Sequence, residues 1–119
     1  RTPRWVWFNR MLDENTFQER ADQALTELHR ALADASEKHD FEADFNSGAL
    51  KVEFDDPPAK FVVSPNSPVR QIWVSAHSKS YKLDWSDAAG AFVLPGTGQT
   101  LRRLMSEAVS RQLGEEITL

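Results

Sequence analysis

Hydrophobic residues in the first third of the chain recur at steps of three and four positions. This spacing places them along one side of a helix, so it predicts an amphipathic α-helix over residues 13–37. Asp13 is the expected N-cap, because its carboxylate can accept hydrogen bonds from the free backbone N–H groups of the first turn. The predicted buried stripe consists of Phe17, Ala21, Ala24, Leu25, Leu28, Leu32 and Ala35.

The middle of the chain alternates between polar and hydrophobic residues, which is the period of a β-strand with one face on a core. Turn-forming residues divide this region into about six strands, expected at residues 40–45, 49–54, 60–64, 70–75, 80–85 and 91–94. Residues 95–98 are then expected to break the sheet. In the first strand, the side chains expected to point inward are Phe41, Ala43 and Phe45.

A second helix is expected over about residues 100–113, with Thr97 or Thr100 as its N-cap and Gly114 as its end. Its predicted buried stripe is Leu101, Leu104, Met105, Ala108 and Leu113. The order of helix, strands and helix predicts an α+β protein. We expect a two-layer α-β sandwich, in which two helices pack on one antiparallel sheet of about six strands and leave its other face in solvent.

The length of 119 residues fits one domain, which we assign to residues 13–119, with an N-terminal extension at residues 1–12. The sequence from Trp5 to Phe8 is too apolar for a free tail, so we expect it to pack on the domain or on a neighbouring copy. The chain begins with Arg1 rather than Met, which fits a processed or trimmed product.

The most informative strand is the one at residues 70–75. Alternation places Gln71, Trp73 and Ser75 on one face, and Ile72 and Val74 on the other. A large aromatic side chain among polar neighbours is a candidate binding site, because tryptophan often anchors interfaces. The alternative is a Trp73 side chain covered by the N-terminal segment.

The overall charge limits the classes of partner. The formal net charge is −4 and the isoelectric point is about 5.3, which argues against nucleic acid and favours cations and basic proteins. The chain has no cysteine, so it forms neither disulfides nor thiolate metal sites. No apolar run approaches the ~20 residues of a membrane span, so we expect no membrane partner.

Acidic residues concentrate in the first helix and the first strand. Ten of the 18 carboxylates lie within residues 13–44, namely Asp13, Glu14, Glu19, Asp22, Glu27, Asp34, Glu37, Asp40, Glu42 and Asp44. Such oxygen ligands suit weak binding of hydrated divalent or ferric ions. The alternative is a solvated helix face with local ion pairs, since Arg30 lies three residues after Glu27 and four before Asp34.

Motifs for catalysis are absent from the sequence. There is no HExxH zinc motif, nucleophile elbow, phosphate loop or dinucleotide fingerprint. His39 adjoins Asp40 and is a candidate to join a metal site, with an exposed loop histidine as the alternative.

Several segments together resemble the frataxin family, over about residues 12–114 and in the family's order and spacing. They are Leu12-Asp13-Glu14, the acidic helix, Asn46-Ser47-Gly48-Ala49-Leu50, the stretch from Pro68 to Ser75, and Asp84-Trp85. The resemblance implies an α-β sandwich and a role in iron–sulfur cluster assembly. It also implies weak iron binding on an acidic ridge, and binding to the cysteine desulfurase–scaffold complex through the exposed sheet.

The resemblance also implies two sets of site residues. The candidate iron ligands are Asp13, Glu14, Asp22, Asp34, Glu37, Asp40 and Glu42. Other ridge positions carry Gln18, Gln23, Arg30 and Ala33 where the family often has acids. The candidate partner-binding residues are Ser64, Asn66, Gln71, Ile72, Trp73 and Lys82.

The leading hypothesis is an iron-binding regulator that binds the desulfurase–scaffold complex, modulates sulfur transfer and delivers iron, without bond chemistry of its own. One alternative is a ferroxidase or iron-storage protein, and another is an adaptor without a metal role. We expect a monomer, with an oligomer dependent on iron or on the N-terminal segment as the alternative. The expected location is the mitochondrial matrix, with the bacterial cytoplasm as the alternative.

Overall fold

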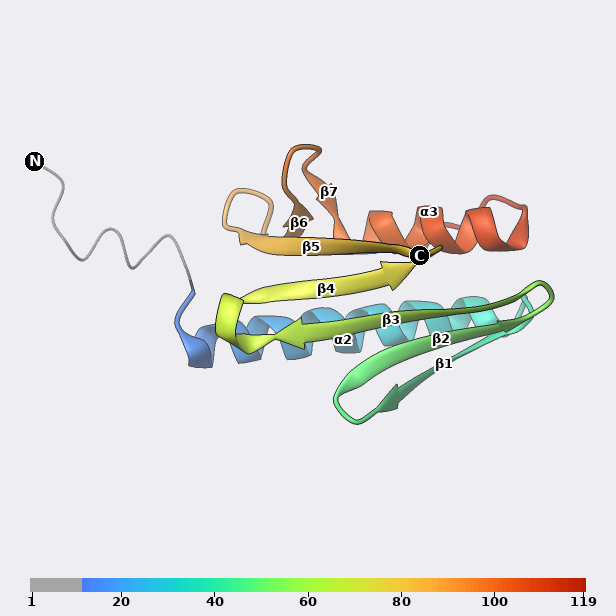
Figure 1. Cartoon of the computed structure of the whole chain (residues 1–119), viewed down its shortest axis with the longest axis horizontal. Coiled ribbons are helices and arrows are strands. Elements are labelled where there is room, and N and C mark those ends of the chain that lie inside the picture. Colours follow the sequence, from blue (N-terminus) through green and yellow to red (C-terminus); the bar gives the residue numbers. More distant parts are fainter. Residues whose placement is uncertain (1–11) are drawn as a thin grey trace, which may run out of the picture.

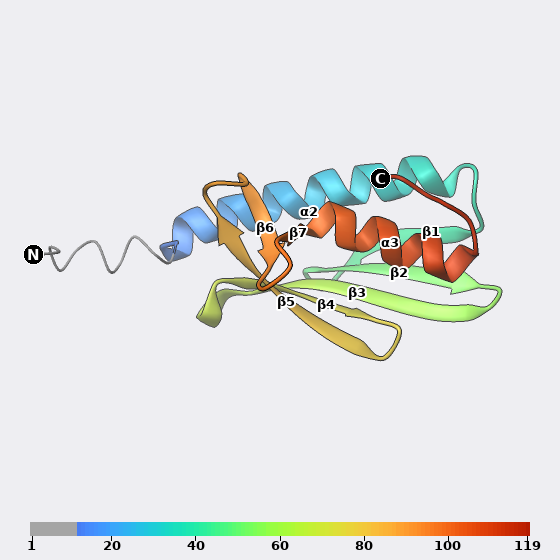
Figure 2. The same cartoon turned by 90° about the horizontal axis from the view of Figure 1, so that it is seen from above.

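Two α-helices lie on the same side of a seven-stranded antiparallel sheet (Figures 1 and 2). The structure is a computed structural model that describes residues 12–119. The expected packing of Trp5 to Phe8 concerns residues outside this described part. The helices are α2 (Glu14–Ser36) and α3 (Leu101–Leu113). The strands are β1 (Phe41–Asn46), β2 (Ala49–Asp55), β3 (Pro58–Asn66), β4 (Gln71–Ala76), β5 (Lys79–Ser86), β6 (Ala91–Leu94) and β7 (Gln99–Thr100).

Helix α2 begins and packs as its sequence predicts. The backbone N–H of Thr16 donates to Asp13 Oδ1 at 2.7 Å, which confirms Asp13 as the N-cap. Every large member of the predicted stripe is buried, while Ala24 and Ala35 are partly buried at its edges. The helix therefore covers the sheet with one face and presents its charged face to solvent.

Helix α3 is held at both ends by the residues that the sequence indicates. Thr100 Oγ1 accepts from the backbone N–H of Arg103 at 3.2 Å, and Gly114 closes the helix in the left-handed conformation with φ of 72°. Val109, which the predicted stripe omits, is fully buried, whereas Ala108 and Leu113 are only partly buried.

After α3 the chain turns back along the two helices (Figure 2). Ser110 fixes this C-terminal segment twice: its hydroxyl donates to the Ile117 carbonyl at 3.0 Å and accepts from the Ile117 N–H at 2.8 Å. The Ile117 side chain is buried in the core. Residues 115–119 thus belong to the helical layer and leave the opposite sheet face uncovered.

All the strands pair with their neighbours in sequence order. The seventh strand was not expected: residues 95–98 form a turn rather than an end to the sheet, and they return the chain so that Leu94 pairs with Gln99 and Val93 with Thr100. Strand β3 is also longer than predicted and includes Pro65, which lies opposite Ile72.

Phe45 corrects the prediction for β1. It is 47% exposed, although the alternation of the strand placed it inward with Phe41. Strand β1 is an edge strand, so a side chain near its end is covered from one side only. The His29 ring, 4.9 Å away between centroids, provides part of that cover.

The core lies between the helices and the sheet, and every buried residue in the described part of the chain is hydrophobic. Its largest fully buried side chains include Phe17, Phe61, Phe92 and Ile72. All polar groups that could bind a partner or an ion in residues 12–119 are therefore at least partly exposed. Within the same residues, neither helix combines the length and apolar character needed to cross a membrane.

Candidate functional site

Within residues 12–119, no segment covers the face of the sheet opposite the helices. This uncovered face carries a group of polar side chains around one tryptophan on β3, β4 and β5. The antiparallel register places Ser64, Trp73 and Lys82 in one row across these strands. It places Asn66, Gln71 and Asp84 in the adjacent row. The structure thus brings together five of the six predicted partner-binding residues. We call this group, with Asp84, the Trp73 face.

Trp73 is held in one orientation by its neighbours. Its indole Nε1–H donates to Gln71 Oε1 at 3.0 Å, and Gln71 Nε2 donates to Asp84 Oδ1 at 3.0 Å. Lys82 Nζ lies 4.8 Å from the centroid of the indole ring, a cation–π distance. The indole is therefore fixed by a hydrogen-bonded chain and by a cation, although it is 36% exposed.

The start of β4 is fixed by Arg70, the residue before Gln71. Arg70 adopts a left-handed backbone conformation with φ of 54° at the end of the short 3-10 helix Ser67–Val69. Its side chain donates to the Leu12 carbonyl at 3.2 Å and to the Ser67 carbonyl. Arg70 therefore ties the chain ahead of the Trp73 face to the beginning of α2.

Ile72 does not belong to this face. Its side chain is fully buried in the core, on the helix side of the sheet. The reason is the alternation of the strand, which sends Ile72 and Val74 to one side and Gln71 and Trp73 to the other. A partner that binds the uncovered face would meet no part of the Ile72 side chain.

Asp84 is the member of the Trp73 face that the sequence prediction left out of the site. Its carboxylate accepts from Gln71 on the neighbouring strand. The available signal was its position two residues after Lys82, which places both side chains on the same face of β5. The geometry of the whole face suits binding: an aromatic anchor is surrounded by hydrogen-bonding groups of fixed orientation.

The candidate iron ligands are arranged differently. Asp13 is engaged as the N-cap of α2, and hydrogen bonds from the Thr16 backbone N–H and hydroxyl lower the pKa of its carboxyl group. The positive charge of Arg70 acts on this pKa in the same direction. The other six are Glu14, Asp22, Asp34, Glu37, Asp40 and Glu42, and all seven carboxylates are exposed.

These carboxylates are spread widely. Glu14 and Glu37 stand at the two ends of α2, about 34 Å apart along the axis at 1.5 Å per residue. Glu42 lies opposite Glu53 and points to the uncovered side of the sheet, away from the helix. Within residues 12–119, no three histidine, aspartate or glutamate side chains are placed to hold a metal ion. Oxygen donors suit hydrated iron chemically, but here they could offer only one or two ligands at a time.

His39 lies beside Glu115 of the C-terminal segment. Its Nδ1 lies 3.3 Å from Glu115 Oε1, and its side chain is 22% exposed. The contact connects the end of α2 to the C-terminal segment. His39 is therefore a half-buried histidine in a tertiary contact rather than an exposed loop residue.

A family model described as the frataxin-like domain matches residues 10–115. The chain belongs to this family. The frataxin-like chain also resembles known bacterial proteins over most of its length. The iron-sulfur cluster assembly protein CyaY of Azotobacter vinelandii is 27% identical over 100 residues, which cover 82% of this chain and 90% of that protein. CyaY of Tolumonas auensis is 34% identical over 80 residues, covering 67% and 74% respectively.

A solved structure supports the fold of this frataxin-like chain. Frataxin from Psychromonas ingrahamii superimposes with a TM-score of 0.72 at 21% identity, covering 90% of this chain and 97% of that one. The expected two-layer α-β sandwich is thus confirmed, with seven strands in place of about six. The relatives named here are bacterial, so they give no support to a mitochondrial location.

Proposed function

We propose that this frataxin-like protein is an iron–sulfur cluster assembly factor that binds the cysteine desulfurase–scaffold complex through the Trp73 face and modulates sulfur transfer. The relatives from Azotobacter and Tolumonas are named iron-sulfur cluster assembly proteins, which supports the process. The observation that carries the proposed site is the fixed, partly exposed Trp73 side chain in the middle of an uncovered sheet.

Ordering the side chains of a binding surface costs free energy. Immobilising a rotamer-rich side chain on binding costs about 0.5–1.5 kcal/mol. The contacts from Gln71 and Lys82 already restrict the indole in the free protein, so less of this cost remains when a partner docks. A tryptophan at the centre of such a surface is the residue type that most often dominates binding energy.

Charge supports a basic partner. The formal net charge of −4 attracts a positively charged surface over a distance of about one Debye length, ~8 Å at physiological salt. Such attraction mainly raises the association rate. In this proposal the carboxylates of α2 and β1 steer the complex into place, and the Trp73 face then provides the specific contacts.

Iron enters the proposal as a weakly bound cargo. The seven candidate ligands, Asp13 among them, offer hard oxygen donors that suit ferrous and ferric ions, but they are dispersed. Delivery of iron to the scaffold would then follow docking, which brings additional ligands from the partner. The bacterial relatives favour the bacterial cytoplasm as the compartment.

The test is cluster assembly on a purified desulfurase–scaffold pair, followed by absorbance and circular dichroism. The arms are no addition, the wild-type protein, Trp73→Ala and Phe45→Ala. Phe45 is a matched control, since it is an exposed aromatic residue on the distant edge strand β1. We expect the wild type and Phe45→Ala to change the rate equally and Trp73→Ala to have no effect. A rate that responds equally to all three proteins would contradict the proposed site.

The dispersed carboxylates of residues 12–119 favour one alternative, a protein-interaction adaptor without a metal role. That alternative expects no selective amide shifts within residues 13–44 when ferrous or cobaltous ions are added. The ferroxidase alternative is tested by oxygen consumption with ferrous iron, against a protein of equal carboxylate content. A rate no faster than that control would exclude it.

A further inference from the structure

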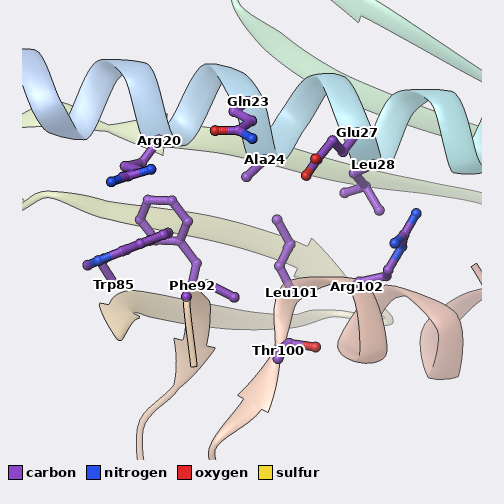
Figure 3. A pocket seen from close by; sticks show the side chains of 12 residues that line it. Arg20, Gln23, Ala24, Glu27, Leu28, Trp85, Phe92, Thr100, Leu101 and Arg102 are labelled. Atoms are coloured by element: carbon purple, nitrogen blue, oxygen red, sulfur yellow. The ribbon is translucent and has the colours of Figure 1, made fainter. Parts of the chain in front are cut away.

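A cavity of about 320 Å³ lies on the other side of the sheet from the Trp73 face. It opens between α2, the strands β5 and β6, and the first residues of α3 (Figure 3). We call it the Trp85 pocket. Its volume is at the lower end of the range of pockets that bind small molecules, about 300–1,000 Å³.

The floor of the Trp85 pocket is aromatic and apolar. The rings of Trp85 and Phe92 meet edge to face with centroids 5.3 Å apart. The side chains of Leu28 and Leu101, both buried, add aliphatic wall from the two helices. The indole is fixed in turn, because its Nε1–H donates to Asp87 Oδ1 at 2.8 Å. A flat apolar ligand would therefore meet a preformed surface.

The rim of the Trp85 pocket supplies positive charge. The guanidinium of Arg20 lies 5.1 Å from the centroid of the Trp85 ring, and Arg102 stands at the opposite end of the row of lining side chains (Figure 3). The ion pairs found within residues 12–119 involve neither arginine. Glu27 is the only carboxylate that lines the pocket within this part of the chain. The side chains that line the pocket thus carry two positive charges and one negative charge, in a protein of net charge −4.

We propose that the Trp85 pocket binds a small carboxylate with an aromatic body. The ring of the ligand lies against Trp85 and Phe92, and its carboxylate accepts from the guanidinium of Arg20. A guanidinium stacked on an aromatic ring keeps its planar donors free at the edge, which suits two parallel hydrogen bonds to one carboxylate. Arg102 adds to the attraction from the far end. This site shares no residue with the Trp73 face, so it stands independently of the proposed function.

The test uses the full chain and two soluble probes of the same shape, indole-3-acetate and its neutral amide, indole-3-acetamide. Each is titrated into isotopically labelled protein and followed by the amide and indole N–H signals. We expect saturable shifts at the Trp85 indole N–H and at backbone amides of the pocket, with the Trp73 indole unchanged. The amide should bind about ten-fold more weakly, because a hydrogen bond to a charged group is replaced by a neutral one.

Substitutions separate the specific contact from general charge. Arg20→Gln should weaken indole-3-acetate about ten-fold while leaving indole-3-acetamide nearly unchanged. Arg20→Lys should restore part of the loss, since it keeps the charge but not the planar donors. Arg103→Gln is the control. It also removes one positive charge, but Arg103, which follows Arg102 in α3, does not line the Trp85 pocket. Thermal melting confirms that each variant is folded.

Three outcomes would overturn the proposal. The first is the absence of saturable shifts at the pocket for either probe. The second is equal binding of both probes, or an equal loss in Arg20→Gln and Arg103→Gln, because the carboxylate would then make no specific contact. The third concerns the aromatic residues Trp5, Trp7 and Phe8. If replacing them with alanine shifts the Trp85 indole signal without any probe, the pocket is filled by the chain itself.

Discussion

The Trp73 face and the dispersed carboxylates of α2 and β1 are both exposed and polar, but they differ in how far their side chains are fixed. On the Trp73 face, two hydrogen bonds of 3.0 Å and a cation–π contact of 4.8 Å connect side chains from β4 and β5. All seven candidate iron ligands are instead exposed, and the six besides Asp13 are spread over about 34 Å of helix and an adjoining strand.

This difference separates two kinds of recognition. A surface whose side chains are already oriented gives specificity, because little conformational entropy is lost when it binds. A surface of separate like charges gives long-range attraction and weak ion binding, both of which depend on salt. We therefore expect substitutions on the Trp73 face to act on the lifetime of a complex, and substitutions of the carboxylates to act on its rate of formation.

We expect the largest effect from substitutions that break the chain of hydrogen bonds on the Trp73 face. Gln71→Ala and Asp84→Ala should each lower the affinity for the desulfurase–scaffold complex about ten-fold, since the indole loses its fixed orientation. The double variant should lose little more than either single variant, because both act through the same side chain. Isothermal titration calorimetry measures the affinities of the wild type, the two single variants and the double variant. Ser75→Ala, on the same face of β4 outside the chain of hydrogen bonds, is the control. Additive losses would contradict the coupling.

A smaller effect is expected from the carboxylates. The double variant Asp22→Asn with Asp34→Asn should slow association about three-fold at low salt, and the difference should vanish near ~0.5 M salt, where the Debye length is only a few ångströms. Surface plasmon resonance provides the rates. Asp55→Asn with Asp56→Asn, at the end of β2 and in the turn that follows it, removes the same charge elsewhere. An effect that persists at high salt would indicate a direct contact instead of steering.

The expected effect on iron affinity is smaller still when any single carboxylate is replaced. Because residues 12–119 contain no assembled group of ligands, each single substitution among Glu14, Asp34 and Glu37 should change ferrous affinity by no more than about two-fold. Anaerobic calorimetry with ferrous iron measures it. A single substitution that abolishes binding would show that a defined site forms around that residue, and would remove the contrast between the two surfaces.

The smallest effect concerns the one candidate ligand that is fixed in place. The pKa of Asp13 is lowered from its usual 3.8 by the Thr16 hydrogen bonds. Its charge therefore stabilises the fold fully above pH 3.8 and loses this contribution as the pH falls through the lowered pKa. Asp13→Asn keeps an N-cap but removes the charge. Its melting temperature should therefore be slightly lower than that of the wild type near neutral pH and the same at strongly acidic pH.

Thermal melts over this pH range measure the difference between the two proteins. Asp13→Ala serves as the control, since it removes the cap at every pH and should stay less stable throughout. A constant gap between the wild type and Asp13→Asn at all pH values would show that the charge contributes nothing.

Much of the fold could be predicted from the sequence because its elements depend on local chemistry. The helical spacing of Phe17 to Leu32 and the caps at Asp13, Thr100 and Gly114 act within a few residues of one another. The exposure of Trp73 follows equally from alternation along a single strand. Strand β7 is not predicted, because its two residues are too few to show an alternating pattern. The exposure of Phe45 is not predicted either, because exposure at a sheet edge depends on the neighbouring layer.

The contacts within the sites were harder to predict than the elements. The hydrogen bond between Gln71 and Asp84 depends on the register of β4 against β5, which pairs residues 13 positions apart. The Trp85 pocket is harder still, because Arg20, Trp85 and Arg102 come from three elements far apart in the chain. Ile72 shows the opposite case: alternation alone places it in the core, whereas the resemblance had included it among the binding residues.

Strand β5 carries the two surfaces on consecutive residues, with Asp84 on the side of Trp73 and Trp85 over the cavity. Because side chains alternate strictly, deleting one residue before Asp84 would turn both side chains to the opposite face, so that the Trp85 indole would enter the polar row beside Gln71 and the Asp84 carboxylate would face the helices. A change in the length of this strand by one residue would therefore damage both surfaces at once.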